Sequence, residues 1–408
     1  MINKESIVAK IKGLFQGDRV IWMVVFFLVL ISLLVVYTSS EQLANRYNQN
    51  NSFILFRHFV MIVLGLVVMV IAANINYKRY SRLLLLLFWI SVPLLLFTML
   101  FGRVVNSAQR GIDIFGVTFQ TSDMAKVALI GFLARVLTLR RDSLSDLKEL
   151  IINVMLPVLV VVGLIFKDNF STAAMLFVTC IVVMFLGKVK TKYILGFVGS
   201  VAVVGIVAFL ILLLVMSGSP DKTNRSLTWA NRIESFFGGG DSKESGMNKE
   251  DNDFQITQSK IAISCGGVLG KGPGKSTQRN ILPHPYSDFI YAIIIEEYGI
   301  VGGVFVLVLY LVLLYRATRV MIRAPQSYGA LLAVGLAFSV VFQAMLNMGV
   351  AVGLLPVTGQ PLPFVSMGGT SLLFTGLAIG IIISVTKEID KVKNDGRDAE
   401  IEDAEADS

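Results

Sequence analysis

Long apolar runs, separated by short charged connections, repeat along the whole chain. A run of about eighteen or more apolar residues predicts a membrane-spanning helix, because a hydrocarbon core of ~30 Å needs ~20 helical residues. Ten runs can be delimited, at residues 20–38, 54–74, 83–101, 121–137, 150–166, 170–187, 193–216, 288–315, 329–355 and 366–386. The pattern predicts an all-α polytopic membrane protein in which residues 1–386 form one ten-helix domain.

Basic residues are concentrated in alternate connections between these runs. The clusters are Lys4, Lys10, Lys12 and Arg19; Lys78, Arg79 and Arg82; Arg140, Arg141 and Lys148; Lys188, Lys190 and Lys192; Arg316, Arg319 and Arg323; and Lys387, Lys391 and Lys393. Excess Lys and Arg stay on the cytoplasmic side. Both termini are therefore predicted to be cytoplasmic, and the large polar connection 217–287, before span eight, is predicted to be extracytoplasmic.

Composition agrees with this class. Hydrophobic residues make up 55% of the chain and charged residues 16%, and the net charge of +8 lies mostly in the short connections, so it indicates orientation and no nucleic-acid partner. No small-residue cleavage pattern follows the first run, which is interpreted as an uncleaved span. Residues 387–408 end in an acidic stretch without apolar periodicity and are expected to be a disordered cytoplasmic tail.

A carboxylate, Asp288, stands where the chain re-enters the membrane after the large connection. Either Ser287 or Asp288 can be the N-cap of span eight, a role that is compatible with a general base because capping fixes the carboxylate. Glu296 and Glu297 follow in the same span. Charged side chains within a span usually face a cavity or a partner, so packing and catalysis are both open for these two glutamates.

A second polar cluster opens span four, with Gln120, Ser122, Asp123 and Lys126. Asp123 reaches Lys126 at i, i+3, and Ser122 shares a helical face with Lys126 at i, i+4. A lysine this deep in a span is expected to be paired or to line a polar cavity. A structural Asp123–Lys126 pair and a ligand-binding role both remain open.

The connection between spans nine and ten contains three of the ten prolines, at residues 355–371. Proline fixes φ and removes a donor, so this segment cannot be a regular helix. Irregular backbone at membrane depth is tolerated where it is buried in protein or lines a wet cavity. We expect the segment, with Ser366, Gly368 and Gly369, to form a wall of the site. Gln343 and Asn347 place two amides on one face of span nine.

Two other kinds of site are not expected. Residues 270–276 resemble a phosphate-binding loop, but the spacing is one residue short and the strand–loop–helix context is missing, so no nucleotide is predicted. Cys180 and Cys265 are not expected to pair. His58 and His284 have no ligand spacing, which argues against a zinc site.

Three segments, in this order, carry a family resemblance. Gln109-Arg110 and the run 120–126 look like R-W-I…Q-P-S-E-x-A-K; the residues from Gln258 through Gly266-Gly267 and Gly270-Lys271-Gly272 to Asp288-Phe289 and Glu296-Glu297-Tyr298-Gly299 look like Q-S…G-G…G-x-G…L-P-E-x-x-T-D-F…G-E-E-x-G; and the run 353–371 looks like G-L-L-P…G-x-x-L-P-F-x-S-x-G-G-S-S. Between about Arg57 and Val385 the chain resembles the SEDS family of bacterial cell-wall glycosyltransferases, the FtsW and RodA proteins. It departs from the family pattern at Gly111, Asp123, His284 and Ser287, and the change at His284 has no explanation in the sequence.

The resemblance implies a peptidoglycan polymerase that joins lipid II, the undecaprenyl-pyrophosphate disaccharide-pentapeptide, into glycan strands outside the cytoplasmic membrane. The attacking sugar hydroxyl must lose a proton, and Asp288 matches the family's catalytic aspartate. Lys126 and Arg110 are the candidates for the pyrophosphate, with Mg²⁺ or Mn²⁺ as a possible cofactor. Further substrate-binding candidates are Gln120, Ser122, Asp123, Gln258, Lys271, Glu296, Ser366, Gly368 and Gly369.

The details Glu-Glu-Tyr-Gly and Ser-Met-Gly-Gly-Thr-Ser look more like FtsW, which implies a place at the bacterial division septum, other division proteins, and an FtsI-like class B penicillin-binding protein as partner. A RodA-type elongation polymerase is the alternative. A lipid II flippase would also contain polar residues within spans, but it is expected to show repeats or broken helices in two corresponding halves, and one interrupted region is visible. A non-enzymatic scaffold explains the tail but not Lys126 or the paired glutamates.

Overall fold

The computed structural model describes residues 16–47, 51–101, 103–105, 108–114, 117–141, 144, 146–216, 247–282, 285–324 and 327–406. Its helices are α2 (Arg19–Tyr47), α3 (Asn51–Asn74), α4 (Tyr77–Phe101), α5 (Thr121–Leu139), α6 (Leu147–Leu150), the π-helical η2 (Ile151–Met155), α7 (Leu156–Asp168), α8 (Phe170–Leu186), α9 (Thr191–Met216), α11 (Met247–Gly266), the short η3 (Gln278–Asn280), α12 (Ile290–Arg323), α13 (Ser327–Ala351) and α14 (Ser371–Ala406). Three short strands are β1 (Arg103–Val105), β2 (Ala108–Ile114) and β3 (Val117–Phe119).

The helical, multi-pass membrane class is confirmed. Seven helices within the described residues are long and apolar enough to cross a membrane, and α8 and the first part of α9 are shorter apolar helices. The remaining predicted span falls on α5, which contains the charged residues Asp123, Lys126 and Arg135. Each of the ten predicted ranges thus lies on a helix. The number of crossings and the sides of the termini stay predictions.

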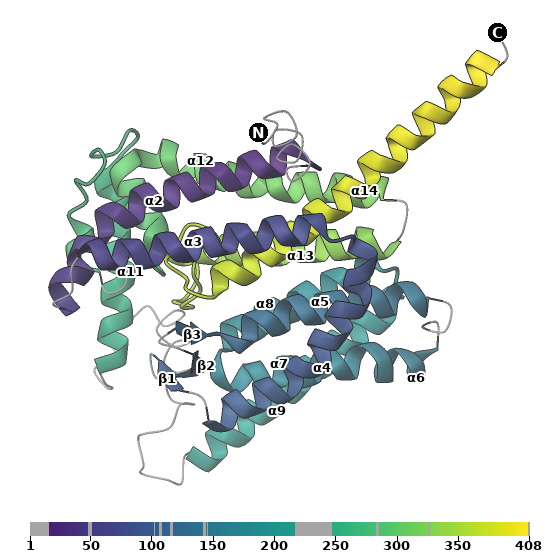
Figure 1. The fold of residues 1–408 in the computed structure, drawn as a ribbon. Coiled ribbons are helices and arrows are strands. Elements are labelled where there is room, and N and C mark those ends of the chain that lie inside the picture. Colours follow the sequence, from purple (N-terminus) through teal and green to yellow (C-terminus); the bar gives the residue numbers. More distant parts are fainter. Residues whose placement is uncertain are drawn as a thin grey trace.

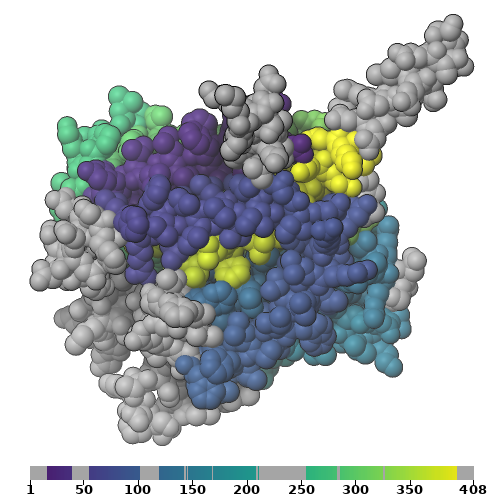
Figure 2. All heavy atoms as spheres, viewed as in Figure 1, coloured from purple at the N-terminus to yellow at the C-terminus, as the bar shows by residue number. Residues whose placement is uncertain are grey.

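The helices form two groups that meet at α13 and α14 (Figure 1). One group contains α2, α3, α12 and the outer helix α11, and the other contains α4, α5, α7, α8 and α9. α13 contacts α5 and α8 as well as α12 and α14, and 78% of its apolar window is buried inside the protein. Figure 2 shows part of α14 (yellow) in the seam between α3 and the residues of the second group.

Small residues bring α3 and α14 close together. Gly376 and Gly380 are one turn apart on α14, and a Cβ at Gly376 would lie 2.3 Å from the carbonyl oxygen of Gly65. A Cβ at Gly380 would meet the Met69 carbonyl oxygen at 2.5 Å. Gly-x-x-x-Gly spacing of this kind lets helix backbones approach within a membrane, where packing replaces the hydrophobic effect as the driving force.

The structure differs from the all-α prediction in the connection before α5. Residues 103–119 form a small antiparallel sheet in the order β1-β2-β3, in which Ile112 lies opposite Phe119 and Ile114 opposite Val117. The sequence explains the second pair of strands, since Ile112-Asp113-Ile114 and Val117-Thr118-Phe119 alternate apolar and polar residues around a two-residue connection. These runs are too short for a hydropathy scan of spans to detect.

Two further departures concern segments expected to be irregular. The predicted outer loop contains α11, which docks on α13 through a hydrogen bond from Ser259 Oγ to the Ala351 carbonyl oxygen (2.6 Å). Residues 387–406, expected to be disordered, continue α14 as helix. That stretch is rich in Glu, Lys and Ala, which favour helix, and it spaces Glu388 and Lys391 at i, i+3.

The predicted span 288–315 is also corrected. α12 begins at Ile290 and contains a break at Gly299, where φ is 71° and ψ is −175°. Before the break, residues 290–297 are all buried, as in a helix that is apolar all round and packed inside a protein. After it, Ile300, Val301 and Val304 are about half exposed. A straight helix of 34 residues would extend ~51 Å, much more than the ~30 Å hydrocarbon core, and the break divides it.

Candidate active site

Asp288 lies in a turn, residues 285–289, that leads into the buried first part of α12. Three hydrogen bonds from other elements hold the backbone of this turn: from Asn347 Nδ2 to the Asp288 carbonyl oxygen (3.0 Å), from Ser366 Oγ to the Ser287 carbonyl oxygen (2.6 Å), and from the Met367 amide to the Tyr286 carbonyl oxygen (3.0 Å). Because these bonds use backbone oxygens, they fix the turn without engaging the carboxylate of Asp288.

The capping interpretation of Ser287 and Asp288 is wrong. The N-cap of α12 is Phe289, and no side chain makes a cap hydrogen bond there. The break between the turn and the helix comes one residue later than the sequence suggests. The Asp288 carboxylate instead accepts one hydrogen bond, from Ser287 Oγ (2.8 Å), and the residue is half-buried. The carboxylate is therefore fixed in position but is not used up by the helix end.

The proline-rich segment forms the wall that holds this turn, as predicted. Residues 354–370 are not helical, and the two amides on one face of α13 bind their backbone. Gln343 Nε2 donates to the Pro361 carbonyl oxygen (2.9 Å), and Asn347 Nδ2 donates to the Gln360 carbonyl oxygen (2.7 Å). Gln360 also donates to Thr172 Oγ1 of α8 (2.6 Å). That last contact joins residues 188 positions apart, and no sequence signal indicated it.

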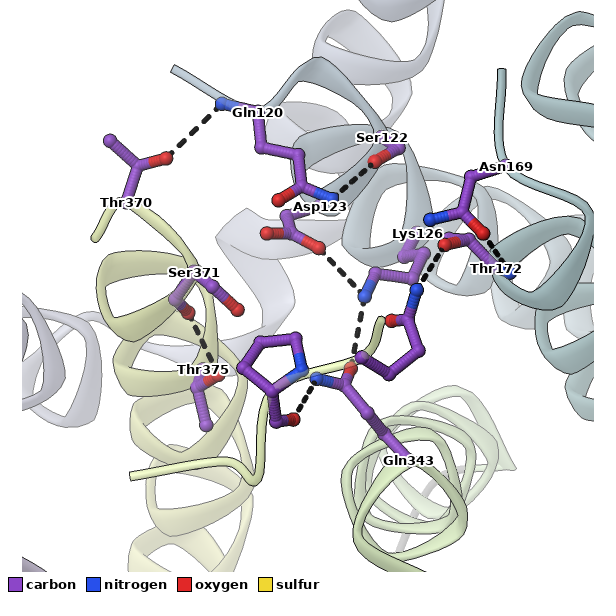
Figure 3. A network of polar contacts seen from close by, with 12 residues as sticks. Gln120, Ser122, Asp123, Lys126, Asn169, Thr172, Gln343, Thr370, Ser371 and Thr375 are labelled. Carbon is purple, nitrogen blue, oxygen red and sulfur yellow. Dashed lines mark hydrogen bonds and ion pairs between the residues drawn. The ribbon is translucent and has the colours of Figure 1, made fainter. Parts of the chain in front are cut away.

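Lys126 and Asp123 form the buried ion pair that their spacing predicts (Figure 3). Lys126 Nζ lies 2.7 Å from Asp123 Oδ1, and the two side chains are 8% and 5% exposed. Lys126 Nζ also donates to Gln343 Oε1 (3.0 Å). An ammonium group has three donors, and these two bonds use two of them. Since Gln343 and Asn347 are one turn apart on α13, the lysine pair and the Asp288 turn are attached to the same wall.

A small cavity of about 30 Å³ adjoins this ion pair, lined by Asp123, Lys126 and Gln343 together with Ser339, Ser371 and Thr375. It is large enough for one or two water molecules. Asp123 Oδ2 is buried and has no hydrogen-bond partner within the described part of the chain. A buried carboxylate oxygen without a donor is costly, so this oxygen is a position where a water molecule or a ligand would be bound.

The other candidates near Lys126 connect α5 to the end of the wall. Gln120 donates from its side chain to Ser122 Oγ (3.2 Å) and from its backbone to Thr370 Oγ1 (3.1 Å) (Figure 3). Gly368 and Gly369 form the turn that starts α14, and Gly369 has a φ of 55°. Gln258 lies half-buried on α11. Arg110 is in β2, and its side chain lies outside the described residues.

Glu296 and Lys271 lie in a different cluster. Glu296 is eight residues after Asp288, ~12 Å along a helix axis. Its carboxylate is buried and accepts five hydrogen bonds, which come from Lys271 Nζ (2.6 Å), Ser276 Oγ (2.5 Å), Thr277 N (3.1 Å), Thr277 Oγ1 (2.9 Å) and Gln278 N (3.2 Å). The sequence did not indicate the hydroxyl partners, although they follow the glycine-rich run directly.

Glycines allow the backbone contacts of this second cluster. A Cβ at Gly266 would lie 2.1 Å from the Ile295 carbonyl oxygen, and one at Gly270 would lie 2.3 Å from the Glu297 carbonyl oxygen. The amides of Lys271 and Gly272 donate to the carbonyl oxygens of Glu296 and Glu297, both at 2.9 Å. The motifs around 266–272 and 296–299 therefore build one backbone interface, on which the Asp288 turn is mounted through the buried helix.

The chain matches the model of the FtsW, RodA and SpoVE family of cell cycle proteins over residues 18–391. The chain belongs to this family. Among its relatives, stage V sporulation protein E of Bacillus subtilis is 31% identical over 91% of this chain and 97% of that protein. A probable peptidoglycan glycosyltransferase FtsW of Coxiella burnetii is 31% identical over 90% of this chain and 96% of that protein. The resemblance to the SEDS family is thereby confirmed.

Solved structures of family members have the same fold. A chain of a peptidoglycan synthase complex that coordinates polymerization and crosslinking superposes with a TM-score of 0.67 at 24% identity, over 92% of this chain and 99% of that chain. The rod shape determining protein RodA of Thermus thermophilus gives a TM-score of 0.64 at 23% identity, over 92% of this chain and 98% of that chain. The match extends over nearly the whole length of both proteins.

Proposed function

We propose that this family member is a peptidoglycan polymerase that extends glycan strands from lipid II, with Asp288 as the general base. One observation carries the proposal: the half-buried Asp288 carboxylate is held by a turn whose backbone is fixed from two other elements, while the carboxylate itself accepts one hydrogen bond. A general base needs this combination of fixed position and free acceptor capacity. The names of the relatives, which include peptidoglycan glycosyltransferases, support the same activity.

The reaction requires one base and positive charge. The attacking sugar hydroxyl gives its proton to Asp288 as its oxygen bonds to the anomeric carbon of the donor, and the bond from that carbon to the pyrophosphate breaks. Pyrophosphate is a good leaving group, so a second carboxyl to protonate it is not needed, in contrast to glycosidases. Lys126 is the described cation closest along the α13 wall, and Arg110 is the second candidate for the departing pyrophosphate.

A divalent cation would fit this site only with help from the substrate. Among the described residues, no three His, Cys, Asp or Glu side chains lie close enough together to bind a metal ion. Mg²⁺ is commonly bound by one or two carboxylates together with substrate phosphates. Asp288 is therefore the residue that would hold Mg²⁺ or Mn²⁺ in the presence of the pyrophosphate, where the cation would offset its negative charge.

The biological setting follows from the family. We propose that the protein acts in the bacterial cytoplasmic membrane at the division septum, together with an FtsI-like class B penicillin-binding protein and other division proteins. The support is that several relatives are named FtsW and that one similar structure comes from a peptidoglycan synthase complex. A role in elongation, as for RodA, is the alternative, and depletion in growing cells distinguishes the two by filaments or by rounded cells.

The decisive experiment measures glycan-strand formation from labelled lipid II by the purified protein, with and without the class B partner. Asp288→Asn keeps the shape of the side chain and removes the base, so we expect a decrease of about 100- to 10,000-fold in rate. Ser287→Ala removes the hydrogen bond to the carboxylate and keeps the base, and we expect a decrease of about tenfold or less. Both variants must unfold at the temperature of the wild type for the comparison to be valid.

Two outcomes contradict the proposal in different ways. If Asp288→Asn polymerises as fast as the wild type, the protein is a polymerase and the assignment of the base is wrong. If the wild type makes no polymer even with its partner and a divalent cation, the activity itself is wrong. The flippase alternative then predicts transport of lipid II across the membrane of proteoliposomes.

A further inference from the structure

A groove that opens sideways lies between α4, α5 and the continuous helix formed by η2 and α7 (Figure 1). Its volume is about 620 Å³, within the ~300–1,000 Å³ that is usual for ligand sites. Its walls are mainly apolar and include Phe88, Trp89, Phe132, Leu156 and Val160. It is separate from the Asp288 and Lys126 site, and none of the residues that line it belongs to the proposed catalytic machinery.

The shape of the groove is built by specific local features. Residues 151–155 form a π-helical stretch that includes Ile152 and Asn153 of the wall. π-Helical stretches are rare and are found often at functional sites. On the opposite side, the rings of Phe88 and Phe132 stack with their centroids 4.2 Å apart and join α4 to α5. The concave surface is therefore not the ordinary convex side of a membrane helix.

One end of the groove is polar and positively charged. The two charged residues that line it are both arginines, Arg135 and Arg140. Arg135 donates to the hydroxyl of Ser81, and Arg140 Nη1 donates to Asn153 Oδ1 (2.6 Å). Glu149, 3.7 Å from Arg140, partly offsets this charge, but the Arg140 side chain remains 54% exposed. The two guanidinium groups form an end that favours an anion.

The length of the groove corresponds to one leaflet of a bilayer. Along α5 its lining extends from Phe132 to Arg140, ~12 Å at 1.5 Å per residue, and along α7 it ends at Val160. Half of a ~30 Å hydrocarbon core is ~15 Å. The charged end lies beside the basic connections 78–82 and 140–148, which the distribution of Lys and Arg assigns to the cytoplasmic side.

From these features we infer that the groove binds one anionic phospholipid of the cytoplasmic leaflet, with an acyl chain along the apolar walls and the phosphate at Arg140 and Arg135. Basic pockets between helices on the cytoplasmic side are typical sites for anionic headgroups. A zwitterionic lipid also has a phosphate, but its ammonium group would be repelled by the same arginines. The inference does not depend on the proposed polymerase activity, because the groove and the candidate active site share no lining residue.

The test is retention of lipid by the full-length protein, measured by native mass spectrometry after reconstitution with equal amounts of phosphatidylglycerol and phosphatidylethanolamine. Val160→Trp fills the groove. Leu159→Trp is the matched control, since Leu159 is 40% exposed, Val160 is 41% exposed, and Leu159 does not line the groove. We expect one phosphatidylglycerol retained per wild-type chain, a decrease of about tenfold in Val160→Trp, and no change in Leu159→Trp.

A second pair of variants tests the charged end. Arg140→Gln is expected to remove the preference for phosphatidylglycerol over phosphatidylethanolamine, while Arg82→Gln, an exposed cation on the same side, is expected to keep it. Equal retention in the two tryptophan variants, equal retention of the two lipids by the wild type, or retention of a polyprenyl-linked lipid in their place would overturn the inference. If Val160→Trp does not fold, the arginine pair decides alone, because both side chains are exposed.

Discussion

The molecule contains two buried pairs of a lysine and a carboxylate, and they differ in what their carboxylates still need. Glu296, paired with Lys271, accepts five hydrogen bonds through its two oxygens. Asp123, paired with Lys126, binds the lysine through Oδ1, while Oδ2 is buried and has no partner within the described part of the chain. The first carboxylate is saturated, and the second is not.

This difference separates a structural pair from a candidate binding pair. A saturated carboxylate has no capacity left for a ligand, and Glu296 uses its acceptors to hold residues 271–278 against α12. An unsaturated one is costly unless water or a ligand completes it. The cavity beside Asp123 and the shared wall with Asp288 indicate that the Lys126 pair belongs to the binding site. Lys271 and Glu296, both predicted to bind substrate, are then supports of the site.

The largest effect is expected from neutralising the two lysines separately. Lys126→Gln should lower the rate of polymerisation per folded molecule by about 100- to 1,000-fold, because a fixed cation near the departing pyrophosphate is lost. Lys271→Gln should lower it by about tenfold or less, because its partner Glu296 keeps four other hydrogen bonds. Initial rates with labelled lipid II, corrected for the folded fraction, give the comparison. Equal losses would show that saturation does not distinguish the pairs.

The sequence anticipated the pair that local spacing defines. Asp123 and Lys126 are three residues apart on one helix, so their contact follows from helix geometry. Hydropathy likewise located the ten helices, and the prolines between α13 and α14 located the wall. The saturation of Glu296 could not be read in the same way, since its partners lie 18 to 25 residues earlier and depend on how the loop folds back. The same is true of α11, whose docking on α13 leaves no apolar run of membrane length.

The next effect in size is on stability and compares the two adjacent glutamates. Glu296→Gln places an amide NH₂ among donors and should lower the free energy of unfolding by about 3 kcal/mol, since hydrogen bonds to charged groups contribute ~1.5–3 kcal/mol each. Glu297→Gln should cost less, because Glu297 Oε1 is buried without a described partner and can be replaced by an amide without losing a bond. Thermal unfolding in detergent measures both. A greater loss for Glu297→Gln would contradict the ranking.

A smaller effect is expected where the loop and α12 touch through backbone. Gly267 and Gly270 both have positive φ, at 54° and 81°, so alanine is strained at either position by ~1–2 kcal/mol. A Cβ at Gly270 would also meet the Glu297 carbonyl oxygen at 2.3 Å, whereas nothing lies within 4 Å of one at Gly267. Gly270→Ala should therefore destabilise the protein by about 2 kcal/mol more than Gly267→Ala. The difference between the two unfolding temperatures isolates the close contact from the strain.

The smallest effect is a pH dependence of the saturated pair. The hydrogen bond to Glu296 raises the pKa of Lys271 above its ordinary value of 10.5. A raised pKa in the folded protein means that the stabilisation is complete below pH 10.5 and is lost as the pH rises through the folded value. The wild type should therefore exceed Lys271→Gln in stability by a constant amount up to about pH 10 and lose this advantage above it. Because Lys271 is 29% exposed, solvent screening keeps the whole difference below about 1 kcal/mol. Chemical denaturation at a series of pH values measures it, and an advantage that persists unchanged at about pH 11 would mean that the lysine acts through packing of its aliphatic chain and not through its charge.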